Sequence, residues 1–98
     1  MELQQTVTLE GRYAPRSAHI LTKEVNEEMV LVDMKRGVYH GLNAVGVQIW
    51  RLLNGTRTLD EIVTTIHAQY ADVDRAVIEG DTLSLVQALV DNELVVAR

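Results

Sequence analysis

Residues Met29–Leu53, MVLVDMKRGVYHGLNAVGVQIWRLL, have the pattern of a strand, a tight turn, a second strand and a helix. The first segment, Met29–Met34, is apolar apart from Asp33, and its length suits a strand better than a helix. Gly37 ends the turn, because glycine takes a positive φ at no steric cost. Val38–Leu42 then alternates as a strand does. The stretch therefore predicts a β-hairpin whose second strand runs almost directly into a helix.

The second strand of this hairpin has two different faces, since successive side chains of a strand point to opposite sides. One face carries Val38, His40 and Leu42, and the other carries Tyr39 and Gly41. Asn43 is suited to cap the helix that follows. Proteins usually guard a sheet edge with Lys, Pro or a bulge, and this strand has neither Lys nor Pro. We therefore expect an unguarded sheet edge at residues 38–42.

Another strand is expected before the hairpin, at 18–25. Together with 29–34 and 37–42 it makes a three-stranded antiparallel meander. At the end of the chain, Leu94-Val95-Val96 is expected to pack on the core or to form a last short strand.

Three helices are expected after the meander. The first covers about 44–53, and the second covers 58–70, where Thr58 and Glu61 make a capping box. The third begins at Asp72 or Asp74 and runs to about 91. The buried stripe of this third helix is expected at Ile78, Leu85 and Leu89, thickened by Val86.

These elements predict an α+β domain, a three-stranded antiparallel sheet followed by three α-helices, with a winged-helix-like order. We assign residues 17–98 to this domain. Residues 1–16 are expected to form an N-terminal arm or an extra strand, because Gly11 and Pro15 interrupt any longer strand there. Exchange of this segment with a second copy, in a homodimer, is a further alternative.

The composition argues against several classes of function. The chain has 98 residues, 9 basic and 14 acidic, and its net charge of −5 repels the phosphate backbone of nucleic acids. No apolar run approaches the roughly 20 residues of a membrane span. The chain has no Cys, which excludes disulfides and thiolate metal sites and fits a cytoplasmic location. We therefore expect neither a nucleic-acid partner nor a membrane partner.

The sequence has no pattern of catalytic or metal-binding residues. Its histidines, His19, His40 and His67, lie far apart, and no two have the spacing of local metal ligands. It also lacks the GxGxxG motif and the phosphate loop. We therefore expect a protein that is not an enzyme and that uses no metal and no cofactor.

A set of residues distributed over about 20–96 forms a more specific pattern. These residues are Gly37, Tyr39, Leu42-Asn43, Gly46, Ile49-Trp50, Gly55 and Ile62, continued by Asp81, Leu85, Leu89 and Leu94. In this pattern the chain resembles the PqqD-like family, the peptide-recognition domains of ribosomal peptide maturation. The resemblance implies a three-stranded sheet followed by three helices, without an active site.

The resemblance also implies a function. In such domains the leader segment of a precursor peptide binds as an added strand on the third strand, and its side chains enter a groove against the third helix. The protein then presents the precursor to a maturation enzyme. The segment from Tyr39 to Trp50 is most similar to the discrete leader-binding proteins of lasso-peptide systems, which work beside a leader peptidase. Two alternatives stay open, a chaperone of the precursor of pyrroloquinoline quinone and a self-associating structural domain.

Strand addition uses main-chain groups of an edge strand for affinity and a neighbouring groove for sequence choice. The groove residues on the third helix are expected to form a stripe at spacings of three, four and seven residues. The expected peptide-binding residues are Val38, Tyr39, His40, Gly41 and Leu42 on the strand, and Leu83, Val86, Gln87 and Val90 on the helix. The acidic residues of that helix either attract basic leader residues or form a solvated face; they are Glu79, Asp81 and Asp91.

Overall fold

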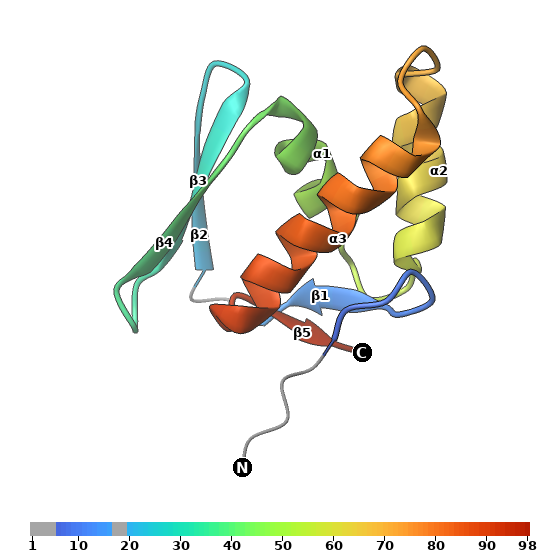
Figure 1. Ribbon diagram of the computed structural model, residues 1–98. Helices are drawn as coiled ribbons and strands as arrows, with labels where there is room; N and C mark the ends of the chain where they lie inside the picture. The colour runs from blue at the N-terminus through green and yellow to red at the C-terminus, as the bar shows by residue number, and fades with distance from the viewer. Residues whose placement is uncertain (1–5, 17–19) are drawn as a thin grey trace.

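The computed structural model of this protein describes residues 6–16 and 20–98. Its main sheet has three antiparallel strands in the order β2-β3-β4. The strands are β2 (Ile20–Val25), β3 (Glu28–Asp33) and β4 (Val38–Leu42). The helices that follow are α1 (Ala44–Leu52), α2 (Leu59–Gln69) and α3 (Arg75–Asp91). This arrangement, drawn in Figure 1, confirms the predicted α+β fold.

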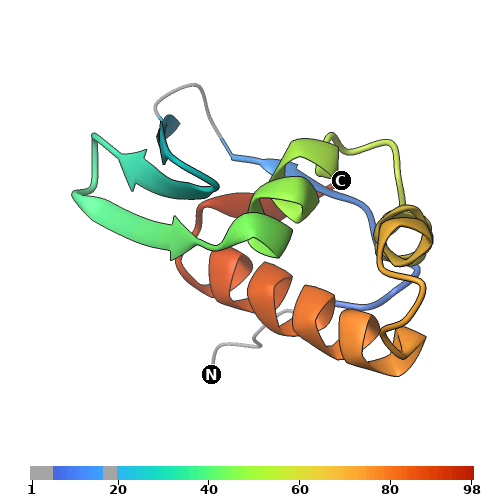
Figure 2. The same ribbon diagram turned by 90° about the horizontal axis from the view of Figure 1, so that it is seen from above.

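The register of the sheet determines which side chains face the helices. Met29 pairs with Leu42 and Leu31 pairs with His40, so these residues share one face. Met29, Leu31 and Leu42 are all buried there. On the opposite face Tyr39 pairs with Val32 and is 76% exposed. Seen from above, the sheet lies on one side of the molecule and the helices on the other (Figure 2). The two predicted faces of β4 are thus confirmed.

The helices begin at the capping residues that the sequence predicts. Asn43 Oδ1 accepts the N–H of Gly46 at 2.9 Å at the start of α1. At the start of α3, Asp74 accepts the N–H of Ala76 at 3.3 Å, so the third helix begins after Asp74 and not after Asp72. Each cap satisfies a main-chain donor that has no partner within its own helix.

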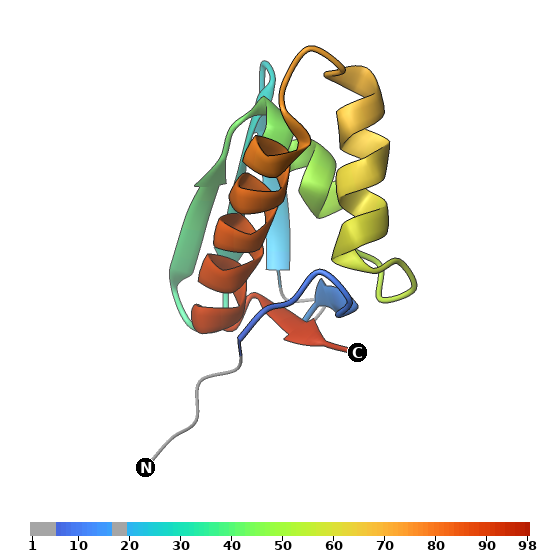
Figure 3. The same cartoon turned by 45° about the vertical axis from the view of Figure 1, so that its right-hand side comes forward.

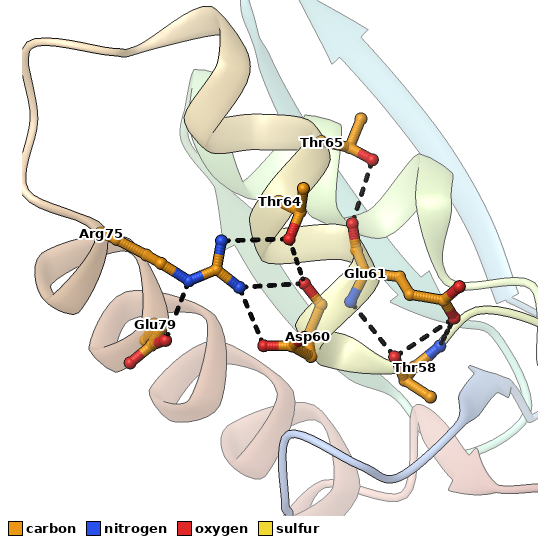
Figure 4. Close-up of polar contacts among 7 residues, drawn as sticks. All are labelled: Thr58, Asp60, Glu61, Thr64, Thr65, Arg75 and Glu79. Atoms are coloured by element: carbon orange, nitrogen blue, oxygen red, sulfur yellow. Dashed lines mark hydrogen bonds and ion pairs between the residues drawn. The ribbon is translucent and has the colours of Figure 1, made fainter.

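The start of α2 is fixed by a reciprocal pair of hydrogen bonds (Figure 4). The N–H of Glu61 donates to Thr58 Oγ1 at 3.2 Å, and the N–H of Thr58 donates to Glu61 Oε1 at 2.8 Å. The main-chain hydrogen bond from Thr58 holds the pKa of Glu61 below its usual value. This is the predicted capping box, in which both hydrogen bonds join residues only three positions apart.

Arg75 joins the start of α3 to the start of α2 (Figure 4). Its Nη2 lies 2.8 Å from Asp60 Oδ1, and its Nε donates to Glu79 Oε2 at 3.1 Å. Its Nη1 donates to Thr64 Oγ1 at 3.0 Å. The hydrogen bond to Asp60 is the largest of the effects that raise the pKa of Arg75 above its ordinary value. These contacts fix the packing of α3 along α2.

Residues 6–16 are packed against the rest of the fold. β1 (Tyr13–Pro15) pairs antiparallel with β5 (Val95–Ala97), and the two lie side by side in Figures 1 and 3. Val7 and Tyr13 lie in the core, so this part of the segment is not a frayed arm. The predicted last strand is present as β5. The division of the chain at residue 16 and the homodimer stay predictions, and residues 18 and 19 of the first predicted strand lie outside the described residues.

Candidate functional site

β4 forms one edge of the main sheet. In the described part of the chain it pairs with β3 and with no other strand. Some of the N–H and C=O groups of an edge strand point away from the sheet and stay available for another extended chain. Of the three strands of the main sheet, β4 is the nearest to α3 in the views from above and from the side (Figures 2 and 3). The expected open edge is therefore present.

Two cavities open beside the C-terminal end of β4. The larger, of about 340 Å³, lies between this end of β4, the start of α1 and the middle of α3; we call it the β4–α3 cavity. Its lining residues are Gly41, Leu42, Asn43, Val45, Gly46, Ile49, Asp81, Ser84 and Leu85. The smaller, of about 280 Å³, lies on the side of β2 and β3 and shares the residues 41–43. Of the two, the β4–α3 cavity lies on the side of α3.

The strand residues expected to bind a peptide lie together on β4. Val38 and His40 are half-buried and Leu42 is buried, all on the side of the helices. Tyr39 and Gly41 are exposed on the opposite face. A Cβ added at Gly41 would meet no atom within 4 Å, so this face of the strand is open at that point. Contact of these residues with a peptide stays a prediction.

The four residues of α3 that were expected to bind a peptide differ from one another in burial and in their contacts. Val86 is 0% exposed and belongs to the core. Leu83 and Val90 are half-buried against that core. Gln87 accepts the N–H of Val7 at 2.9 Å, and its Nε2 donates to Asp91 at 3.0 Å. None of the four predicted helix residues lines the β4–α3 cavity.

Sequence reasoning had not assigned the wall of the cavity on α3 to Asp81, Ser84 and Leu85. A usable signal was present in the chain. The core residues Ile78, Thr82, Val86 and Leu89 mark one face of α3. Asp81 and Leu85 each precede a core residue by one position, so at 3.6 residues per turn they flank the buried face on the same side, and Ser84 lies next to Asp81 on the helix surface. Flanking positions are where a helix meets a cleft and not a core.

Arg36 ties the turn between β3 and β4 to the end of α3. Its Nη1 donates to the main-chain oxygen of Asn92 at 2.9 Å. The turn itself is held by the buried Asp33, whose Oδ1 accepts the N–H of Lys35 at 3.0 Å and of Arg36 at 3.1 Å. Sequence reasoning missed this link because the partners are distant in the chain. It holds β4 near α3 at the end opposite to the β4–α3 cavity.

The part of the chain that the structure describes has no arrangement typical of a metal centre. Within residues 6–16 and 20–98, no three His, Cys, Asp or Glu side chains lie close enough to hold a metal ion. His67, in α2, has its Nε2 3.0 Å from the main-chain oxygen of Val73, whereas His40 is in β4. His19 lies outside the described residues. In the same residues, no helix has the length and apolar character needed to cross a bilayer.

The family profile described as Coenzyme PQQ synthesis protein D (PqqD) matches residues 28–95. The chain belongs to the PqqD family. The match to PqqD begins with β3 and ends at the first residue of β5, so it contains β4, all three helices and every residue of the β4–α3 cavity. β1 and β2 precede the matched region.

Two solved structures resemble this PqqD chain. One is described as TbiB1 in complex with the TbiA(beta) leader peptide; it is 37% identical, covers 83% of this chain and 93% of the TbiB1 chain, and has a TM-score of 0.70. The other is the heterocyclase TruD, 19% identical over 90% of this chain and 12% of TruD, with a TM-score of 0.59. The likeness to TruD shows the fold alone. A comparison with curated proteins gave no match.

Proposed function

We propose that this member of the PqqD family binds the leader segment of a ribosomally made precursor peptide by β-strand addition to β4 and delivers the precursor to a maturation enzyme. The protein itself catalyses no step. The main support is the free edge of β4 beside the β4–α3 cavity. The similarity to TbiB1, which was solved with a leader peptide, supports the same function.

The two parts of the proposed site have separate tasks. Main-chain groups of Val38–Leu42 pair with the leader and supply affinity for any extended segment. Because main-chain pairing does not depend on side chains, sequence choice comes from the cavity walls. Leu83, Gln87 and Val90 remain candidates for contact with the part of the leader that extends beyond the cavity. Val86, which is 0% exposed, supports this surface from the core.

We further propose that the partner is the leader peptidase of a lasso-peptide pathway. The support is the resemblance of the segment from Tyr39 to Trp50 to the discrete leader-binding proteins of such pathways. The competing function is a chaperone of the precursor peptide in pyrroloquinoline quinone biosynthesis, which the description of the matching family favours. Co-purification of the chain with the enzymes encoded beside it distinguishes the two, because one neighbourhood supplies a peptidase and cyclase and the other a radical enzyme.

Isothermal titration with the leader peptide of the neighbouring precursor gene tests the proposed site. Proline removes a main-chain donor, and in an edge strand only alternate donors point outward. We therefore expect one of the variants Tyr39→Pro and His40→Pro to lose leader binding while circular dichroism stays unchanged. Tyr39→Val keeps the N–H and should retain most of the affinity. Normal binding by both proline variants would rule out strand addition at β4.

A second titration tests the part of the site on α3. Leu83→Glu places a charge on a half-buried position without opening the core, and we expect weaker leader binding. Ala68→Glu, at an exposed position of α2, is the matched control. Equal affinity of the two variants would remove Leu83 from the site.

A further inference from the structure

The acidic side chains of α3 differ in what they contact. Glu79 Oε2 accepts from Arg75 Nε at 3.1 Å, and Asp91 Oδ1 accepts from Gln87 Nε2 at 3.0 Å. Asp81 lines the β4–α3 cavity and has no ion pair within the described residues. Of the acidic residues of this helix, Asp81 alone lines that cavity, and its carboxylate is available to a ligand.

The cavity combines this carboxylate with an apolar base. Ile49 is 1% exposed and Leu42 is 4% exposed, so the deepest part of the lining is aliphatic. Asp81 and Ser84 are exposed and lie three positions apart on one face of α3, which places both polar groups at the rim. Asn43, at the opposite rim, uses its Oδ1 for the N–H of Gly46.

We propose that the β4–α3 cavity takes a lysine or arginine side chain of the leader peptide, with the aliphatic stem against Leu42, Ile49 and Leu85 and the cationic group on the Asp81 carboxylate. Long basic side chains bury their methylene stems along apolar surface and keep the charged group at the rim. The cavity matches such a side chain, because its base is aliphatic and its rim carries a carboxylate. This assignment rests on the proposed binding of a leader along β4.

Other side chains fit this cavity less well. An apolar side chain fills the base but covers Asp81 without offering it a partner, and a carboxylate withdrawn from water without a partner is unfavourable. An acidic side chain meets a like charge at the rim, in a protein whose net charge is already −5. A basic side chain packs its methylene stem on the aliphatic base of the cavity and pairs its charge with Asp81 at the rim. Asp81 is therefore the residue that sets which leader side chain is accepted here.

The test is a double-mutant cycle between the protein and a synthetic leader peptide from the neighbouring precursor gene. Each Lys or Arg of the peptide is replaced in turn by Met, which keeps an apolar stem and removes the charge. We expect one replacement to weaken binding to the wild type about tenfold, as for a charge-assisted hydrogen bond partly shielded from water. The same replacement should have little effect on Asp81→Asn, because the partner charge is already absent. Glu79→Gln, an equal change of charge on the same helix, should bind every peptide as the wild type does.

The outcomes separate this assignment from the proposed function. If the unmodified leader binds the wild type but no basic residue couples to Asp81, leader binding stands and the assignment of the cavity is wrong. A leader that binds and contains no Lys or Arg in its bound segment has the same consequence. If the unmodified leader fails to bind at all, the proposed function falls and this assignment falls with it. Restored affinity when Asp81→Lys meets a peptide with Glu at the coupled position supports the pairing directly.

Discussion

Arg36 and Asn92 are distant in the sequence and are joined by a hydrogen bond, from Arg36 Nη1 to the main-chain oxygen of Asn92, at 2.9 Å. Nη2 of the same side chain lies 3.0 Å from Glu93 Oε2. A cation at this end of α3 also complements the negative end of the helix dipole. The turn between β3 and β4 is thus held on the end of α3, and the two elements that border the proposed peptide site are fixed to each other.

Replacing Arg36 with Met should loosen this connection while keeping an apolar stem of similar length. The contacts are about half exposed, so we expect the free energy of unfolding to fall by only about 0.5–1 kcal/mol. A bound leader peptide should dissociate faster, because β4 is less firmly held. Denaturant unfolding and stopped-flow binding measure the two effects. Arg16→Met is the control, since Arg16 also pairs with Glu93, at 3.0 Å, but lies outside the hairpin. Identical dissociation rates for the two variants would contradict a role of the link in binding.

Thr82→Val should stabilise the protein. Thr82 is 0% exposed, and its Oγ1 has no hydrogen-bond partner within the described residues. A buried hydroxyl without a partner is unfavourable by about 1 kcal/mol or more, and valine has nearly the same shape. We expect the free energy of unfolding to rise by about 1 kcal/mol. Thr82→Ser, which keeps the hydroxyl and loses the methyl group, should lower it. A destabilised Thr82→Val variant would mean that the hydroxyl has a partner in solution.

The two glycines inside helices should respond differently to alanine. A Cβ added at Gly80 in α3 meets no atom within 4 Å, so Gly80→Ala should raise the free energy of unfolding by about 1 kcal/mol. At Gly46 in α1 an added Cβ lies 3.3 Å from Leu42 Cβ and 3.3 Å from Asn43 Oδ1. This crowding opposes the gain in helix propensity, so Gly46→Ala should be neutral or destabilising. Thermal unfolding of both variants compares them, and equal stabilisation would argue against the close packing at Gly46.

The capping box predicts a pH dependence of stability. Hydrogen bonds from Thr58 lower the pKa of Glu61 in the folded protein relative to the unfolded chain. A carboxylate of this kind stabilises the fold above its unfolded pKa, and the contribution is lost as the pH falls through the folded pKa. Glu61→Gln should therefore be less stable than the wild type at neutral pH and should approach it in acid. Denaturant titrations of both proteins at a series of pH values measure this difference, and a difference that stays constant with pH would disprove the effect.

Several features of this protein follow from contacts within a few residues. The capping box of Thr58 and Glu61 connects positions three apart, and the two faces of β4 follow from simple alternation. Asn43 caps α1 as predicted, for the same reason. These local signals predicted the α+β fold and its order of elements.

The cavity wall on α3 could not be predicted in this way. Val86 was expected both in the buried stripe and at the peptide, and it is 0% exposed, whereas Leu85 was expected in the buried stripe and lines the β4–α3 cavity. One step along a helix turns the side chain by about 100°, and α3 carries apolar residues on much of its surface. The pattern therefore does not select one face, and the packing of α3 in the core selects it instead, with Ile78, Val86 and Leu89 as its buried aliphatic residues.

The sequence by itself determined the three strands of the main sheet, the three helices, the caps Asn43 and Thr58, and the buried face of β4, because these depend on neighbours along the chain. Only the tertiary structure decided that Tyr13–Pro15 pairs with Val95–Ala97, that Arg36 reaches Asn92 and that Asp81 lies beside the end of β4. Each of these brings together residues that are distant in the sequence. Their contacts form only when the whole core is packed, and local preference carries no information about them.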